Sequence, residues 1–347
     1  MDPSVYIPAY LERAYLASHP ELTDAARELV HNDVSVNPHK YAQTEHAQAL
    51  LSYAGVHRHL LDELHRIEDM GSDEEFEQTR NHLFDDTRDE LLKIVRVDAL
   101  AVDAQLLAII LADTPVDACL GDLMKLEATT TDYLQQSVPG FDMEAPHYWA
   151  NKVLADGVTA ADLTVSEPAL IGWLHTLEAI SQLCIASARY RAAANYARRV
   201  LKAEGYPTRA AGTVLLALAR LEDEDGFFAL AHQLEEQMGA DTLENSPWYL
   251  LARTILLFKT NKMRPATRAL REFANRCEGG AFFLLNPMYQ TPYLPCRPEP
   301  HDPLGTFRIR QFGRRRHHLG YSDFAPWANA CEDVSQLAQE FVRRYGF

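Results

Sequence analysis

The sequence predicts an all-α protein, built as a right-handed superhelical array of antiparallel helix pairs and followed by an irregular, proline-rich C-terminal segment. Apolar residues recur with the helical period along most of the 347-residue chain. Convincing runs of strictly alternating apolar and polar residues, which half-buried strands show, are absent from the sequence. Many of the predicted helices come in pairs with short joints, as stacked helical hairpins require.

Residues 1–136 form the first predicted region, which is helical throughout. In 73–95 the apolar side chains fall on one stripe and most of the acidic side chains lie elsewhere. Ser72 and Glu75 have the spacing of a capping box at the start of that helix. Thr114 followed by Pro115 pairs a good N-cap with proline at the first helical position. The periodicity predicts helices over 7–18, 22–32, 39–69, 73–95, 99–112 and 115–136.

Residues 137–166 form a predicted irregular connection, because they contain Pro139, Gly140, Pro146 and Gly157 and few long apolar stripes. A repeat region then follows over 167–277. Ser246 and Pro247 again combine an N-cap with proline at the first helical position. Helices are predicted over 167–186, 189–204, 209–222, 225–238, 247–260 and 264–277.

Residues 278–347 form the last predicted region. The stretch 278–330 holds seven prolines, and proline at that density is incompatible with a helix interior. We expect this stretch to fold back over the repeats or to cap the last one. The chain ends with an amphipathic pattern over 334–345, which predicts a C-terminal capping helix.

Three helix pairs between 167 and 277 align on an anchor residue early in the second helix. These anchors, Ala193, Leu230 and Ala266, are 37 and 36 residues apart, close to the period of about 34 residues in tetratricopeptide repeats. The region therefore resembles a tetratricopeptide-like helical repeat protein. A second likeness is carried by four segments, Asp98–Ile110, Glu127–Thr130, Leu183–Tyr190 and Leu215–Met238. Through these segments the chain is similar to the suppressor-of-tumorigenicity family of helical repeat proteins, and this resemblance implies a scaffolding role.

In arrays of the tetratricopeptide type, the first helix of each pair lines a concave surface. Here that surface predicts a groove for an extended or helical peptide, polar at one end and aromatic at the other. The apolar members could equally belong to the core, because strongly apolar first helices are usually buried. The predicted groove residues are His175, Glu178, Gln182, Glu222, Trp248, Leu251, Ile255 and Phe258.

The net charge of −16 argues against a general nucleic-acid binder and against binding to anionic membranes. The charge is uneven: residues 1–100 carry 9 basic and 20 acidic residues, whereas residues 297–347 carry 8 and 6. The acidic N-terminal part favours a protein or peptide partner with basic character. Five widely spaced cysteines, no secretory signal and no apolar run of membrane-spanning length predict a cytoplasmic protein.

One alternative function is a phosphate or nucleic-acid site in the basic segment 308–318. Its arginines stand beside aromatic residues, a combination that suits phosphate contact and base stacking. The same arginines could instead pair with the acidic face of the protein around 68–90. The residues concerned are Arg308, Arg310, Arg314, Arg315 and Arg316.

A second alternative is an enzyme or ligand sensor with a pocket between the N-terminal helices and the repeats. The residues to test there are His57, His59, Asp62 and His65, which lie within one predicted helix. A metal site would need more inward-facing ligands than this spacing supplies, so no metal and no cofactor are predicted. Phosphate-cradling glycine loops, dinucleotide fingerprints and nucleophile elbows are also absent from the sequence. The leading prediction is a protein-binding scaffold without catalytic activity.

Overall fold

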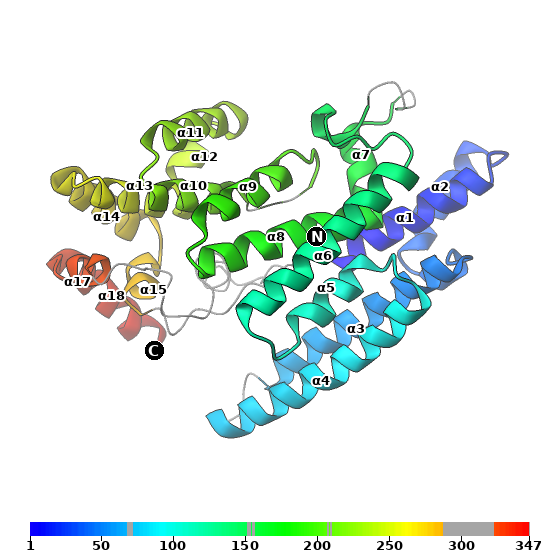
Figure 1. Cartoon of the computed structure of the whole chain (residues 1–347), viewed down its shortest axis with the longest axis horizontal. Coiled ribbons are helices and arrows are strands. Elements are labelled where there is room, and N and C mark those ends of the chain that lie inside the picture. Colours follow the sequence, from blue (N-terminus) through cyan, green and yellow to red (C-terminus); the bar gives the residue numbers. More distant parts are fainter. Residues whose placement is uncertain are drawn as a thin grey trace. The chain divides into compact units, whose positions relative to one another are not determined.

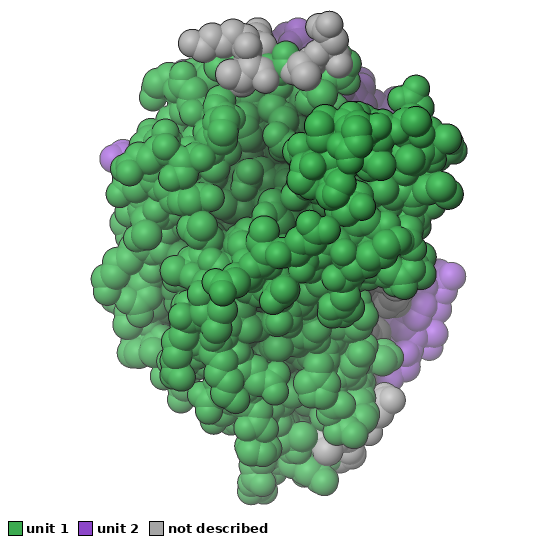
Figure 2. Space-filling model, turned by 90° about the vertical axis from the view of Figure 1, so that its right-hand side faces the viewer, with its two compact units in different colours: residues 1–179, 202–207, 295–298 green, residues 180–201, 208–294, 299–347 purple. Residues whose placement is uncertain are grey.

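The structure is a computed structural model that describes residues 1–67, 72–150, 154, 157–206, 208, 210–286 and 323–346. All of the secondary-structure elements in these ranges are helices, so the predicted all-α class is confirmed. The described chain divides into two compact units (Figure 2). Among the described residues, unit 1 contains those of 1–179 and 202–206, and unit 2 contains those of 180–201, 208–286 and 323–346.

Unit 1 is built around a long helix pair, α3 and α4, which run side by side (Figure 1). α5 packs against α4, α6 packs against α5, and α1 packs against both α2 and α3. Short 3₁₀ turns cover Pro38–Lys40 and Pro146–Tyr148. The helices of this unit are α1 (Pro3–Ser18), α2 (Asp24–Val34), α3 (Glu45–Ile67), α4 (Asp73–Val97), α5 (Val102–Ile110), α6 (Val116–Ser137), α7 (Ala160–Val165) and the first part of α8 (Pro168–Ala186).

Side-chain caps explain where several of these helices begin. At α4 the Ser72 side chain accepts a hydrogen bond from the Glu75 amide, which is the serine half of the predicted capping box. The prediction at α6 was displaced by one residue. Pro115 itself occupies the N-cap position, and the helix begins at Val116 without a side-chain cap. Thr114 therefore lies outside the helix that it was expected to cap.

The stretch 137–166 contains one helix that periodicity did not predict. α7 is only 6 residues long, too short to show a helical stripe. Its local signal is a capping box, in which Thr159 and Asp162 bond each other's backbone amides.

Unit 2 contains the remaining helices. α9 packs against α10, α10 packs against α13, and α13 packs against α14. The helices of this unit are the end of α8, α9 (Tyr190–Leu201), α10 (Ala210–Leu221), α11 (Glu224–Met238), α12 (Ala240–Glu244), α13 (Pro247–Lys259), α14 (Met263–Arg276), α15 (Gly280–Leu285), α17 (Phe324–Asn329) and α18 (Glu332–Tyr345).

One turn recurs three times in unit 2, at the left-handed residues Ala188, Glu222 and Asn261, with φ values of 60°, 60° and 57°. Each left-handed residue lies one or two residues after the end of one helix, and the next helix begins two residues later. In each case the amide after the left-handed residue donates to the carbonyl five residues earlier, as in a Schellman motif. These hydrogen bonds are Arg189 to Cys184 (2.7 Å), Asp223 to Leu218 (3.1 Å) and Lys262 to Leu257 (2.9 Å).

The helices that follow these turns also bury the same positions. The fifth, ninth and twelfth residues after each left-handed residue are buried: Ala193, Ala197 and Val200; Phe227, Ala231 and Leu234; and Ala266, Leu270 and Phe273.

This common pattern corrects the predicted repeat alignment. The equivalent of Ala193 and Ala266 is Phe227 rather than Leu230, so the middle copy was misplaced by three residues. The prediction took a small or apolar residue as the anchor, and both Leu230 and Phe227 satisfy that criterion. Phe227 stacks on Tyr249 of α13, with ring centroids 5.9 Å apart.

The C-terminal helices of unit 2 pack on the end of the helix pairs. α18 contacts α14 and α15, and α17 contacts α15 and α18. Phe341 of α18 stacks on Phe282 of α15, with ring centroids 5.1 Å apart. α15 and α17 are short helices that the proline content concealed. The greater part of the predicted covering stretch, 287–322, lies outside the described residues.

Candidate functional site

Four of the predicted groove residues are buried. His175 and Leu251 are 0% exposed, Ile255 is 1% exposed and Glu178 is 6% exposed. Glu178 accepts a hydrogen bond from the Tyr206 hydroxyl at 3.0 Å. These four side chains therefore have their contacts inside the fold.

The other four predicted groove residues also contact the protein itself. Gln182 donates to the Thr213 hydroxyl at 2.8 Å, and Glu222 pairs with Lys259 at 2.8 Å. The Trp248 ring lies directly against Gly212 of α10. Phe258 meets the rings of Phe324 and Trp327 of α17, with centroids 5.1 and 4.8 Å away. Peptide binding by these residues stays a prediction.

The histidine cluster of α3 is divided between two faces of the helix. His57 is 3% exposed and lies 5.9 Å from the Tyr53 ring, whereas His59, Asp62 and His65 are exposed. In the described part of the chain, no group of three or more His, Cys, Asp or Glu side chains is arranged to hold a metal ion.

The predicted anion-binding residues Arg308, Arg310, Arg314, Arg315 and Arg316 all lie outside the described residues. Their role stays a prediction.

A buried ionic network joins three helices of unit 1. Asp103 of α5 accepts hydrogen bonds from His175 of α8 at 2.8 Å and from the Tyr6 hydroxyl of α1 at 2.6 Å. Burial alone would raise the pKa of Asp103, but the charge and hydrogen bond of His175 and the hydrogen bond from Tyr6 outweigh it and lower the pKa. The amino group of Met1 lies 2.6 Å from the second ring nitrogen of His175. Both oxygens of the carboxylate thus have partners within the fold.

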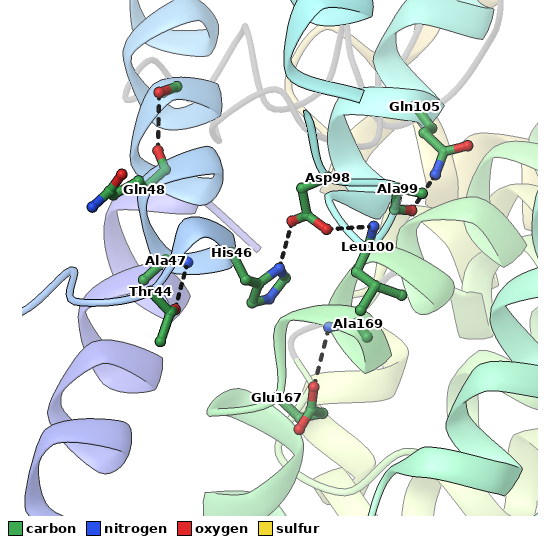
Figure 3. A network of polar contacts seen from close by, with 11 residues as sticks. Thr44, His46, Ala47, Gln48, Asp98, Ala99, Leu100, Gln105, Glu167 and Ala169 are labelled. Atoms are coloured by element: carbon green, nitrogen blue, oxygen red, sulfur yellow. Dashed lines mark hydrogen bonds and ion pairs between the residues drawn. The ribbon is translucent and has the colours of Figure 1, made fainter. Parts of the chain in front are cut away.

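A second polar group in unit 1 is only partly buried, and we name it the Glu167 cluster. Its members come from five separate places in the chain: Tyr10 in α1, His46 in α3, Asp98 after α4, Tyr133 in α6 and Glu167 before α8. The His46 Nδ1 atom lies 2.6 Å from an Asp98 carboxylate oxygen, and the other oxygen accepts from the Leu100 amide at 2.9 Å. Figure 3 shows the His46 and Asp98 side chains directed toward each other, and the Glu167 carboxylate on a neighbouring element directed to the Ala169 amide.

Aromatic contact and charge link the tyrosines to this cluster. The Tyr10 ring meets the His46 ring edge to face, with centroids 5.5 Å apart. Burial, followed by the nearby negative charge of Glu167, raises the pKa of the Tyr10 hydroxyl. The same two causes, in the same order, raise the pKa of the Tyr133 hydroxyl. Both tyrosines therefore remain protonated and present hydroxyl groups near a carboxylate.

Glu167 is the least well compensated member of the cluster. Burial raises the pKa of its carboxyl group, and the opposing effects of the Ala169 amide, Arg13 and His46 are smaller. Its single hydrogen bond from a described residue comes from the Ala169 amide at 3.4 Å. The exposed Arg13 side chain instead donates to the Ser166 hydroxyl at 2.9 Å.

Sequence reasoning missed both polar groups of unit 1, because their partners are distant along the chain. His46 and Asp98 are 52 residues apart, and Asp103 and His175 are 72 apart. One usable signal was present: Asp103 and His175 are ionisable residues inside otherwise apolar helices, and such residues are rarely buried without a partner.

α8 is the one helix in the described residues that is long and apolar enough to cross a membrane, with a mean hydropathy of 1.3. However, 78% of that stretch is buried inside the protein, as in a core helix. Length and composition alone are therefore weak evidence for a membrane span here.

No protein-family model, curated protein or solved structure matches the chain. The resemblance to tetratricopeptide-like proteins and to the suppressor-of-tumorigenicity family therefore stays a prediction from the sequence.

Proposed function

We propose that the chain is a tetratricopeptide-like helical repeat protein that binds another protein, and that it acts as a scaffold without catalytic activity. The observation that carries this proposal is the recurrence of one hairpin turn at Ala188, Glu222 and Asn261 with the same buried positions after each turn. Stacked helical hairpins bury a continuous core and leave extended surfaces that suit protein binding.

We further propose that the partner presents a basic segment to the outer face of α4. Seven carboxylates on this helix are exposed: Glu74, Glu75, Glu77, Asp85, Asp86, Asp89 and Glu90. Two of them have a basic side chain nearby, with Arg80 3.9 Å from Glu77 and His82 3.4 Å from Asp86. Asp85, Asp89 and Glu90 make no ion pair within the described ranges. Complementary charge on a partner would speed association and favour that partner over others.

The experiment is affinity capture from the native host with the full chain, comparing two variants of equal charge change. Asp85→Lys/Asp89→Lys alters the α4 face, and Glu28→Lys/Glu235→Lys alters exposed carboxylates on α2 and α11. We expect the wild type and the control variant each to capture one partner protein in a stoichiometric amount. It should be lost from the α4 variant and weakened by added salt.

Two results would count against the proposal. Recovery of a small molecule or a nucleic acid in place of a protein would refute the scaffold function. Equal capture of the same protein by both variants would refute the role of α4 and leave the scaffold function in place.

A further inference from the structure

We propose that the Glu167 cluster of unit 1 binds a primary ammonium group, supplied by a small aliphatic amine or by a lysine side chain. This inference is independent of the scaffold function, because it rests on a different set of residues.

The first argument is the charge of Glu167. Its carboxylate is partly buried, forms no ion pair within the described part of the chain and has one long hydrogen bond, from the Ala169 amide at 3.4 Å. A poorly compensated carboxylate of this kind is stabilised when a cation binds beside it. Arg13 compensates this charge only in part, because its side chain donates to the Ser166 hydroxyl, which leaves a role for an external cation.

The second argument is the set of hydrogen-bond acceptors around that carboxylate. We assign the proton of His46 to Nδ1, because Nδ1 lies 2.6 Å from Asp98. Nε2 is then a hydrogen-bond acceptor, and no described residue bonds to it. The Tyr133 hydroxyl oxygen adds a further acceptor, and the Tyr10 hydroxyl oxygen, which already has a hydrogen bond with Thr44, has a second lone pair. An ammonium group carries three N–H donors and therefore matches acceptors that surround it from several helices.

The third argument excludes other ligand classes. Asp98 and Glu167 place two carboxyl groups in the cluster, which disfavours phosphate and other anions. No described set of three ligating side chains is arranged to hold a metal ion. The aromatic rings of Tyr10 and Tyr133 can instead contact the aliphatic chain of an amine and attract its positive charge.

Capping of α8 is the competing structural role for Glu167, since its carboxylate accepts from the second residue of that helix. Glu167→Gln separates the two roles, because glutamine keeps an oxygen that can accept from Ala169 and loses only the charge. Glu28→Gln is the matched control, because Glu28 is an exposed glutamate of α2 in the same unit.

The test is a titration of the full chain with n-butylammonium chloride. Binding is measured by calorimetry and by the shift in the melting temperature of the protein. Tetramethylammonium chloride at the same concentration is the control for ionic strength and for a cation without N–H donors. We expect saturable binding of butylammonium to the wild type and to Glu28→Gln. The affinity of Glu167→Gln should be lower by about tenfold or more.

A further titration identifies the source of the ammonium group. Saturable binding of Nα-acetyl-lysine methylamide would indicate a lysine side chain as the ligand, whereas binding of butylammonium alone would indicate a free amine. The proposal is overturned if butylammonium does not saturate the wild type, if tetramethylammonium binds equally well, or if a folded Glu167→Gln variant binds with unchanged affinity.

Discussion

The contact between Gly212 of α10 and Trp248 of α13 is the most direct test of how the repeat helices pack. A Cβ atom added to Gly212 would lie 2.3, 2.5 and 2.7 Å from three atoms of the indole ring. Real Cβ contacts essentially never approach that closely, and a flat ring in a packed position cannot yield by rotating one bond. The two helices must separate, or the ring must leave its place.

The expected cost of Gly212→Ala follows from two opposing terms. Alanine in place of glycine favours a helix interior by about 1 kcal/mol. Overpacking of a filled site typically costs about 1–3 kcal/mol, and a contact this short belongs at the upper end. We therefore expect a net loss of about 1–2 kcal/mol in the free energy of unfolding.

Gly55→Ala in α3 is the matched control, because nothing lies within 4 Å of a Cβ atom added there. It should stabilise the protein by about 1 kcal/mol, so the two variants should differ in sign. Urea titrations followed by circular dichroism measure both. In a Trp248→Leu background the cost of Gly212→Ala should shrink toward zero. A Gly212→Ala variant as stable as the wild type would refute the packing of α10 on α13.

Three further predictions concern unit 1 and the recurring turn. Asp103→Asn should lower the free energy of unfolding at neutral pH, measured by urea titration, by about 3 kcal/mol or more, because it leaves His175 without its buried ionic partner. The folded-state pKa of Asp103 is lowered, so the cost should shrink as the pH falls below about 4, and a cost that does not change with pH would contradict the ionic pairing. Glu167→Gln should raise the melting temperature at pH 7, because the pKa of the wild-type carboxyl is raised in the folded state and its ionised form is disfavoured there. That gain should vanish below about pH 4, where the carboxyl is protonated in both states; a lower melting temperature at pH 7 would refute the argument. Ala188→Gly should stabilise the protein by about 0.5–1 kcal/mol, because glycine avoids the penalty of about 1–2 kcal/mol at a left-handed residue and loses part of that gain through unfolded-state entropy. An unchanged or lower urea midpoint would contradict the left-handed turn.

Helix positions were predictable from the sequence because amphipathic periodicity is a local signal. The predicted helix 247–260 corresponds to α13 (Pro247–Lys259), and 264–277 corresponds to α14 (Met263–Arg276). The repeat alignment was less predictable, because residue size varies at an equivalent position. Phe227 occupies the place that alanine holds in the two other copies, so the residue type at the anchor did not determine the register.

The polar sites were not predictable in the same way. Each is formed by side chains from helices that are far apart in the chain, and periodicity carries no information about which helices become neighbours. The histidine cluster of α3 shows the converse. Sequence proximity placed His57 and His59 together, but helical positions two residues apart do not face each other. His57 is buried and His59 is exposed.

The two polar groups of unit 1 differ in how their charges are compensated, and this difference separates a structural role from a binding role. Asp103 has hydrogen bonds from His175 and Tyr6 that lower its pKa despite burial. Glu167 has one long hydrogen bond, and burial raises its pKa. A fully partnered carboxylate needs nothing from outside the protein and fixes the helices that it joins. A carboxylate left poorly partnered costs stability in the free protein, and the binding of a cation would recover that stability. The same substitution should therefore have opposite effects at the two sites, with Asp103→Asn weakening the fold and Glu167→Gln strengthening it while removing the ammonium site.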